Sequence, residues 1–250
     1  MKLDLIFSVN LFSLTSSISI MKMLAEQAEK NILTAIIDAD KPNSITEDDF
    51  EDEVYDEHGE SHPYTRIIYS CGSCVGYDPD EVLFEYKFLI TQLTRRSAFL
   101  TMFGLFEHRI SNCFELMTKL INCNQDIKGK GPIEKTQNLL KSEFGAKNIP
   151  DVDHLTVIRN IMIHNDGTAP NYRKILSKTD KKTDAEKRLL KAIKRTPELR
   201  VNNFNGLIMD EGFLQYAVSE FDRYTKSLEI VIQTYHKEMT SQDSSSSSEV

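Results

Sequence analysis

The sequence has no tract rich in glycine or proline, with 10 glycines and 7 prolines among its 250 residues. It is therefore not a low-complexity chain. It also has no apolar run long enough to cross a membrane. Positive charge is not in excess, and the net charge of −8 argues against a general nucleic-acid coat protein while leaving room for a local basic surface. The length fits one globular domain with appendages or two small domains.

The first twenty residues only partly resemble a signal peptide. A lysine precedes an apolar stretch, but Asp4 and Asn10 interrupt that stretch and no small-residue cleavage site follows. We therefore expect a cytoplasmic protein without a membrane segment. A helix with apolar residues at helical spacing begins near Met21, which is an alternative start to Met1.

The stretch from Asp38 to Glu60 is strongly acidic, with Lys41 as its one basic residue apart from histidine. Such a run is typical of a solvated, mobile loop. A calcium-binding loop needs a carboxylate five residues before its glycine, and Val54 stands at that place before Gly59. We expect no metal and no other cofactor.

A lone C-x-x-C pair, Cys71 and Cys74, follows the acidic run. The other cysteines, Cys113 and Cys123, are ten residues apart on an expected helix, about 15 Å along its axis, so they cannot pair with each other. A zinc or redox regulator built around Cys71 and Cys74 is one alternative function, and the nearby imidazoles for such a site are His58 and His62.

From Asp78 to about Cys123 the pattern predicts one long helix, or two helices broken near Gly104. Apolar residues recur there in steps of three and four, which predicts a packing seam along Phe99, Phe103, Phe106, Ile110, Cys113, Met117 and Leu120. Glu107 lies beside this seam. A further helix is expected from Pro132 to Gly145, and the short links between helices favour an up-and-down bundle.

The stretch DVDHLTVIRNIMIHNDG, from Asp151 to Gly167, is predicted to be one helix that ends through a left-handed turn. Its apolar stripe consists of Leu155, Ile158 and Met162. The opposite face carries Asn160 and His164, bracketed by Ile161 and Ile163, which are poor choices for a face that meets only water. A second layer is therefore expected over this face, either from another part of the chain or from a second copy.

Arg159 and His164 on this helix have both an ordinary and a functional interpretation. A histidine in the last turn and an arginine on the flank are common in structural helices. The same positions also suit chemistry, because the helix C-terminus stabilises the cationic imidazole as a proton donor and an arginine offers a forked cation to phosphate.

The region from Arg173 to Arg200 is rich in lysine and arginine. It is either a solvated helical face or a track for a phosphate backbone, with candidate contacts at Lys174, Lys181, Lys182 and Arg188. Tyr172 is the one aromatic residue that flanks it, so base stacking is not expected there.

The C-terminal part begins with a β-hairpin signal. Asn205-Gly206 lies within an alternating stretch and predicts a hairpin from Glu198 to Asp210. A last helix should follow from Glu211 to about Lys237, and the serine-rich residues 241–250 are expected to be a disordered tail.

The segment Arg159-Asn160-Ile161-Met162-Ile163-His164, followed by Asn165 and Gly167, resembles the Arg-x4-His signature of the HEPN superfamily of helical ribonucleases. The resemblance implies a mainly α fold: an up-and-down helical bundle over residues 63–240, with the small hairpin before the C-terminal helix. Residues 1–62 would be an N-terminal helical segment with an acidic loop.

The resemblance also implies a function. HEPN ribonucleases cleave RNA without metal, through attack by the 2′-OH. His164 would then move a proton, Arg159 would stabilise charge on the phosphorane, Asn160 would hold the pair in register and Glu107 would orient Arg159 or His164. The expected partners are RNA, a second copy of the chain across a two-fold axis beside His164 and a cognate antitoxin or regulator, in a toxin or a phage-defence effector. The alternative is a HEPN-like dimeric interaction module without catalysis.

Overall fold

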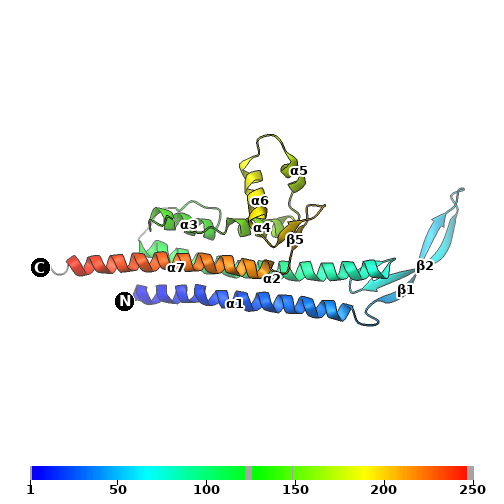
Figure 1. The fold of residues 1–250 in the computed structure, drawn as a ribbon, viewed down its shortest axis with the longest axis horizontal. Helices are drawn as coiled ribbons and strands as arrows, with labels where there is room; N and C mark the ends of the chain where they lie inside the picture. Colours follow the sequence, from blue (N-terminus) through cyan, green and yellow to red (C-terminus); the bar gives the residue numbers. More distant parts are fainter. Residues whose placement is uncertain (1, 122–125, 148, 247–250) are drawn as a thin grey trace. The chain divides into compact units, whose positions relative to one another are not determined.

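The computed structural model describes residues 2–121, 126–147 and 149–246 of the chain (Figure 1). These residues are mainly helical, with seven helices and two small antiparallel sheets. The helices are α1 (Lys2–Ala39), α2 (Pro79–Leu120), α3 (Pro132–Ser142), α4 (Asp153–His164), α5 (Tyr172–Ser177), α6 (Asp184–Arg195) and α7 (Phe213–Ser246). The strands are β1 (Thr46–Tyr55), β2 (Ser61–Cys71), β3 (Cys74–Gly76), β4 (Leu199–Val201) and β5 (Leu207–Met209).

The chain divides into two compact units, and both α1 and α2 contain the point of division. The first unit consists of residues 1–26 and 97–250, and the second of residues 27–96. The boundary that we predicted between residues 62 and 63 falls within β2. The acidic run and the C-x-x-C pair, which the sequence suggested were separate features, therefore belong to the same unit.

Aromatic side chains from α2 and α7 form the core of the first unit. The predicted seam of α2 is buried from Phe99 to Met117, and α2 is one continuous helix through Gly104. Phe106 stacks on Phe221 of α7 with ring centroids 4.4 Å apart. Cys123, which we predicted on this helix, lies outside the described residues.

The helix α1 begins well before Met21. Leu14, Ser17 and Met21 are fully buried at helical spacing, so residues before Met21 contribute to the core of the first unit. The stripe is hard to recognise in the sequence because a serine occupies one of its positions. The Ser17 hydroxyl donates to the carbonyl oxygen of Leu14 at 2.6 Å, which satisfies the polar atom inside the core.

The acidic run is not the loop that we predicted, because its residues 46–55 form strand β1. This strand pairs with β2 over its whole length, from Thr46 opposite Ser70 to Tyr55 opposite Ser61. Arg66 on β2 forms an ion pair with Asp52 on β1 at 2.6 Å and lies over the ring of Phe50. Such cross-strand contacts stabilise a strand whose acidic composition disfavours it.

Cys71 and Cys74 face each other across the turn between β2 and β3. Gly72 in this turn has φ of 59°, a conformation that favours glycine. Both thiols are buried against Val82, and burial raises the pKa of Cys74. The thiolate that zinc binding or redox chemistry requires is therefore disfavoured at Cys74, and both cysteines pack in a small apolar cluster with Val82.

The helix α3 and the β4–β5 hairpin follow the sequence prediction closely. Gly145 after α3 has φ of 62°, and the backbone N–H of Ala146 donates to Leu140 in the manner of a left-handed helix stop. The hairpin pairs Leu199 with Met209 and Val201 with Leu207.

The last helix, α7, is longer than we predicted. It continues to Ser246 and so includes six residues of the segment 241–250 that we expected to be disordered, while residues 247–250 lie outside the described part. Among the described helices, none combines the length and the apolar character of a membrane span.

Candidate functional site

The predicted helix around the Arg-x4-His segment is present as α4, and it stops where the sequence indicates. The backbone N–H groups of Asn165 and Gly167 both donate to the carbonyl oxygen of Ile161. Asp166 and Gly167 have φ of 45° and 74°, which turns the chain away from the helix axis. The imidazole of His164 therefore lies in the last turn of α4, beside the negative end of the helix dipole.

One face of α4 packs into the core as predicted. Leu155, Ile158 and Met162 are buried. Ile161 is also buried, at 5% exposure, so the same chain covers it, which is the first of the two alternatives that we expected for this face. Ile163 is 53% exposed and is the apolar residue of this face that remains open.

Arg159 is held by three groups. One terminal nitrogen of its guanidinium, Nη2, donates to both carboxylate oxygens of Glu107 on α2, at 2.8 and 3.0 Å. The other, Nη1, donates to Oδ1 of Asn160 at 2.8 Å. The guanidinium carbon lies 4.8 Å from the centre of the Phe103 ring. These contacts fix the half-buried Arg159 side chain in one orientation, and they make Glu107 the carboxylate that orients it.

Arg159, Asn160 and His164 all line one cleft of about 710 Å³ within the first unit. The helices α3, α4 and α6 all contribute residues to its lining, and we call the parts from α3 and α6 its walls. Its other lining residues are Glu107, Lys130, Gly131, Ile133, Glu134, Gln137, Asn138, Lys141, Asp151, Asp153, Thr156, Arg188 and Lys191. A volume of this size admits a small molecule or a short stretch of a single strand.

The shared cleft brings together two side chains that ideal helix geometry separates. Residues 159 and 164 are about 140° apart around an ideal helix, which would direct their side chains to different places. Both nevertheless line this cleft, because Arg159 bends toward Glu107 and Asn160. The imidazole of His164 is exposed, and no hydrogen bond joins it to another described residue. A single copy thus presents both groups to one space.

No family model, curated protein or solved structure matches this chain. The chemistry of the cleft must therefore be argued from its own residues.

Two of the acidic groups in the cleft are already neutralised by cations. Arg188 of α6 forms a forked pair with Asp153, and Arg195 of α6 donates to Asp151 at 2.5 Å. Burial alone would raise the pKa of Asp151, but the charge and hydrogen bond of Arg195 outweigh it and lower that pKa below its usual value. Asp151 and Asp153 are therefore both engaged by arginines of α6.

Three lysines of the cleft remain available to an anion. They are Lys130, which precedes α3, Lys141 of α3 and Lys191 of α6, and among the described residues none of their ammonium groups has an ion pair or hydrogen bond. Together with His164 they give the cleft four cationic or potentially cationic side chains without partners in the described part of the chain. Such a set suits a phosphate-containing ligand.

The basic region that follows α4 is largely used within the fold. Lys178 pairs with Glu186 at 2.9 Å, and Lys182 donates to the carbonyl oxygen of Lys178. Of the four predicted phosphate contacts, Arg188 lines the cleft, whereas Lys174, Lys181 and Lys182 do not. Of the predicted phosphate contacts, only Arg188 therefore lies at the cleft. The lysines that line the cleft are ones that we did not predict as phosphate contacts.

The polar stripes that line the cleft were visible in the sequence but were not recognised as a site. On α3 they recur as Glu134, Asn138 and Lys141, and on α4 as Asp153, Thr156, Asn160 and His164. Polar residues at helical spacing usually mark a solvated face, so the pattern identifies a cleft wall only when two such stripes are known to face each other.

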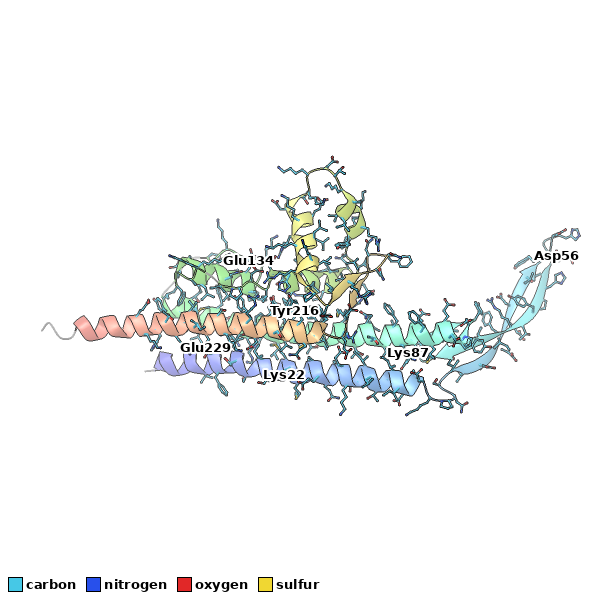
Figure 2. The ribbon with its side chains drawn as sticks, viewed as in Figure 1. Lys22, Asp56, Lys87, Glu134, Tyr216 and Glu229 are labelled. Carbon is cyan, nitrogen blue, oxygen red and sulfur yellow. The ribbon has the colours of Figure 1, made fainter. Side chains whose placement is uncertain are left out.

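A second histidine of α4, His154, is buried beneath this site and was not predicted. Its Nε2 lies 2.9 Å from the hydroxyl of Tyr216 on α7, which is labelled in Figure 2, and that hydroxyl donates to the carbonyl oxygen of Arg195. The imidazole must therefore donate to Tyr216 through Nε2, and its Nδ1 has no partner within the described structure.

The surroundings of His154 keep it neutral. Burial is the main cause, and the charge of Arg195 adds to it, so that the pKa of His154 is lowered to about 4. Glu220 opposes this shift with a carboxylate oxygen 3.5 Å from Nε2, but Arg195 and Arg223 both engage that carboxylate. His154 is a structural group of the network below the cleft.

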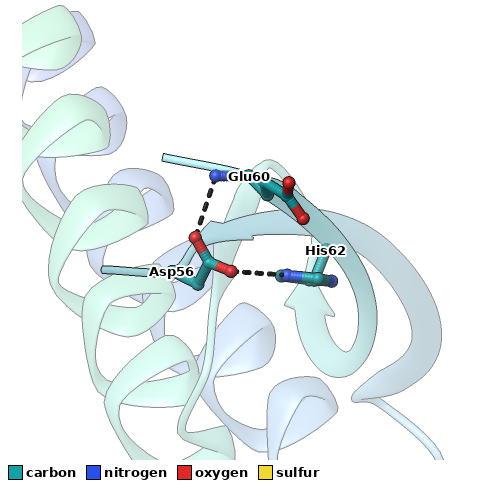
Figure 3. Close-up of side chains that lie close together, drawn as sticks. All are labelled: Asp56, Glu60 and His62. Atoms are coloured by element: carbon teal, nitrogen blue, oxygen red, sulfur yellow. Dashed lines mark hydrogen bonds and ion pairs between the residues drawn. The ribbon is translucent and has the colours of Figure 1, made fainter. Parts of the chain in front are cut away.

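A cluster of metal-ligand type lies at the turn between β1 and β2. The ligand atoms of Asp56, Glu60 and His62 are within 4.8 Å of one another, and all three side chains are exposed (Figure 3). Asp56 accepts from the backbone N–H groups of His58 and Glu60 at 2.9 Å and lies 3.2 Å from Nε2 of His62. The bond from Glu60 contributes most to lowering the pKa of Asp56, followed by His62. These hydrogen bonds stabilise the turn between β1 and β2, and they explain why the three side chains lie close together.

His62 is thereby placed at the opposite end of β2 from Cys71. Within the part of the chain that the structure describes, no cluster of three metal-ligand groups includes Cys71 or Cys74.

Proposed function

We propose that the cleft of the first unit is the active site of a metal-independent endoribonuclease of the HEPN type. The observation that carries the proposal is that Arg159, Asn160 and His164 line one cleft, with Arg159 oriented by Glu107. The helical first unit, which contains the motif helix together with α3, α6, α7 and part of α2, would be the HEPN-like bundle. Toxins and phage-defence effectors are the roles that the family resemblance suggests.

The reaction follows from the chemistry of these side chains. The 2′-OH of a ribose attacks the adjacent phosphate, which forms a 2′,3′-cyclic phosphate and releases the 5′-oxygen. His164 is exposed to the cleft and has the free nitrogens that proton transfer requires. Arg159 offers a guanidinium to the extra negative charge on the phosphorane. General acid–base catalysis of this kind typically contributes about 10² to 10⁴ in rate.

Glu107 and Asn160 act on Arg159 in this mechanism. The fork between Arg159 and Glu107 keeps the guanidinium in position before substrate arrives, which lowers the cost of ordering it in the transition state. Asn160 uses its Oδ1 for Arg159 and leaves its amide NH₂ group for a phosphate oxygen or a ribose hydroxyl. Lys141 and Lys191 would hold the flanking phosphates from the two walls.

A second copy of the chain is a separate proposal. Ile161 is already covered and the cleft contains both Arg159 and His164, so the case for a dimer rests on Ile163 alone. A two-fold axis beside Ile163 would cover it and bring two clefts near each other. A cognate antitoxin or regulator over the same face is the corresponding proposal for a toxin.

The experiment that tests the proposed reaction uses RNA and a chelator. The purified chain is incubated with single-stranded RNA in EDTA, and the ends of the products are analysed. We expect cleavage to persist and to leave 2′,3′-cyclic phosphate or 3′-phosphate ends, as attack by the 2′-OH requires. Loss of cleavage in EDTA with recovery on adding magnesium would instead indicate a two-metal nuclease.

A further inference from the structure

The tip of the β4–β5 hairpin exposes an aromatic ring on a well-ordered turn. Phe204 is 87% exposed. The Oδ1 of Asn202 accepts from the backbone N–H groups of Phe204 and Gly206, at 2.9 and 2.7 Å. The backbone N–H of Asn202 donates to the carbonyl oxygen of Gly206 at 2.9 Å, and Asn205 has φ of 64°. A ring on so constrained a turn loses little freedom when it binds a partner.

Cations lie beside this tip. Arg173 of α5 donates from Nε to the carbonyl oxygen of Asn202 at 3.2 Å and from Nη2 to Oδ1 of Asn203 at 2.6 Å. Its backbone N–H donates to Oδ1 of Asn205 at 3.1 Å. Residues 171–178 and 202–206 together carry Arg173, Lys174 and Lys178 and no carboxylate, and Glu186 pairs with Lys178. The two segments therefore present amides and positive charge beside Phe204, and they also expose the apolar side chain of Leu176, at 59%.

The same tip is joined to the end of α4 that carries His164. The backbone N–H of Ala169 donates to Asn205 and that of Leu207 to Gly167, both at 2.8 Å. Gly167 belongs to the left-handed stop that follows His164. The hairpin therefore extends the surface of the first unit at the His164 end of the motif helix.

We propose that Phe204 stacks on a base of a single-stranded RNA whose neighbouring phosphates are bound by Arg173 and Lys174. The inference rests on the proposed function, since the strand would be the one that reaches His164. A ring stacks on any base because every base has a π face, and cations beside it bind the backbone without reading sequence. The cations beside the ring favour a nucleic acid over a peptide, because a phosphate backbone supplies the negative charge that they bind.

This site could not be predicted from the sequence, because its aromatic and basic residues are far apart in the chain. Tyr172 was the one aromatic residue that flanked the basic region, whereas Phe204 reaches it through a hairpin whose Asn203 is 30 residues from Arg173. The fold therefore supplies the aromatic partner that the basic region lacked.

The test measures binding without cleavage. All proteins carry His164→Ala, and fluorescence anisotropy follows a labelled single-stranded RNA of about 12 nucleotides. Phe204→Ala should raise the Kd about 5- to 150-fold, which is 1–3 kcal/mol per stacked base at 1.4 kcal/mol per tenfold. Phe204→Tyr should restore most of the affinity. The matched control is Phe84→Ala, because Phe84 is 72% exposed but lies between acidic residues 80, 81 and 85.

Salt dependence separates stacking from phosphate binding. Phe204→Ala should leave the slope of log Kd against log salt unchanged, because stacking releases no counterions. Lys174→Ala should reduce that slope by about 0.7, the value for one phosphate contact on a single strand.

Three outcomes would overturn the inference: equal Kd for Phe204→Ala and its parent, an equal loss in Phe84→Ala, or no RNA binding by the parent. Cleavage by the wild-type chain together with unchanged binding by Phe204→Ala would reject the stacking site and leave the proposed function intact. RNA binding that depends on Phe204, without RNA cleavage by the wild-type chain, would reject the proposed function and leave the stacking site intact. Melting temperatures confirm that each variant is folded, as expected for so exposed a side chain.

Discussion

The two ends of α4 each carry a histidine, and the fold uses them in opposite ways. His154 in the first turn is 2% exposed, donates to Tyr216 and is kept neutral by burial. His164 in the last turn is exposed to the cleft and has no hydrogen-bond partner in the described structure. The packing around one helix has thus made a structural group of one imidazole and left the other free for chemistry. The predictions below test this division.

The largest expected effect is on catalysis. His164→Ala should reduce RNA cleavage by about 10² to 10⁴ while leaving the melting temperature unchanged, because an exposed side chain contributes little packing. His108→Ala is the matched control, since His108 is exposed on α2 and does not line the cleft. Initial cleavage rates and thermal melts measure both variants. A His164→Ala protein that cuts at the wild-type rate would show that the division between the two histidines is wrong.

The second effect is on stability as a function of pH. The pKa of His154 is lowered from 6.5 to about 4 in the folded chain, so its stabilising contribution is complete above pH 6.5 and is lost as pH falls toward 4. At 1.36 kcal/mol per pKa unit the loss is about 3 kcal/mol, or about 300-fold in the folding equilibrium.

Urea denaturation between pH 7 and 4 measures this slope. His154→Gln should lose most of the dependence in this window, because glutamine can still donate to Tyr216 and does not titrate. The pKa of Asp151 is also lowered, but its contribution is lost only below its ordinary value of 3.8, in a different range. An unchanged pH dependence in His154→Gln would assign the acid sensitivity to another group.

The third effect concerns the proposed second copy. Ile163→Asp should raise the dimer dissociation constant by about tenfold or more, because a buried and unpaired carboxylate opposes association. Ile163→Leu is the matched control, and light scattering over a range of concentrations gives the constant. A wild-type chain that is monomeric and fully active at nanomolar concentration would remove the dimer from the proposal.

The smallest effect is on the walls of the cleft. Lys141→Ala and Lys191→Ala should each weaken RNA binding a few-fold. Each should also reduce the slope of log Kd against log salt concentration by about 0.7. Lys194→Ala is the control, because Lys194 is exposed on α6 but does not line the cleft. If all three variants change RNA affinity and its salt dependence equally, the RNA phosphates are not bound along the cleft.

The motif helix could be predicted from the sequence because its signals are local. The stripe from Leu155 to Met162 and the stop at Gly167 depend on residues within a few turns of each other. The contact between Arg159 and Glu107 spans 52 positions, and it could be anticipated only because Glu107 lies beside a clear packing seam.

Other features required the fold. His154 and Tyr216 are 62 positions apart, and nothing in either segment indicates the other. Strand β1 was mistaken for a loop because acidic residues hide the strand pattern, and its partner Arg66 lies on the next strand. Ser17 interrupted a buried stripe in the same way, because its hydroxyl is satisfied by its own helix. In each case a polar residue was satisfied by a neighbour that the local pattern does not reveal.

Arg195 connects the buried network to the cleft. Its guanidinium binds Asp151, which lines the cleft, and Glu220, which lies beside His154. A ligand that strengthens the contact between Arg195 and Asp151 also keeps a positive charge close to the imidazole and so opposes its protonation. Thermodynamic reciprocity then requires that the ligand bind more weakly once His154 has taken up a proton.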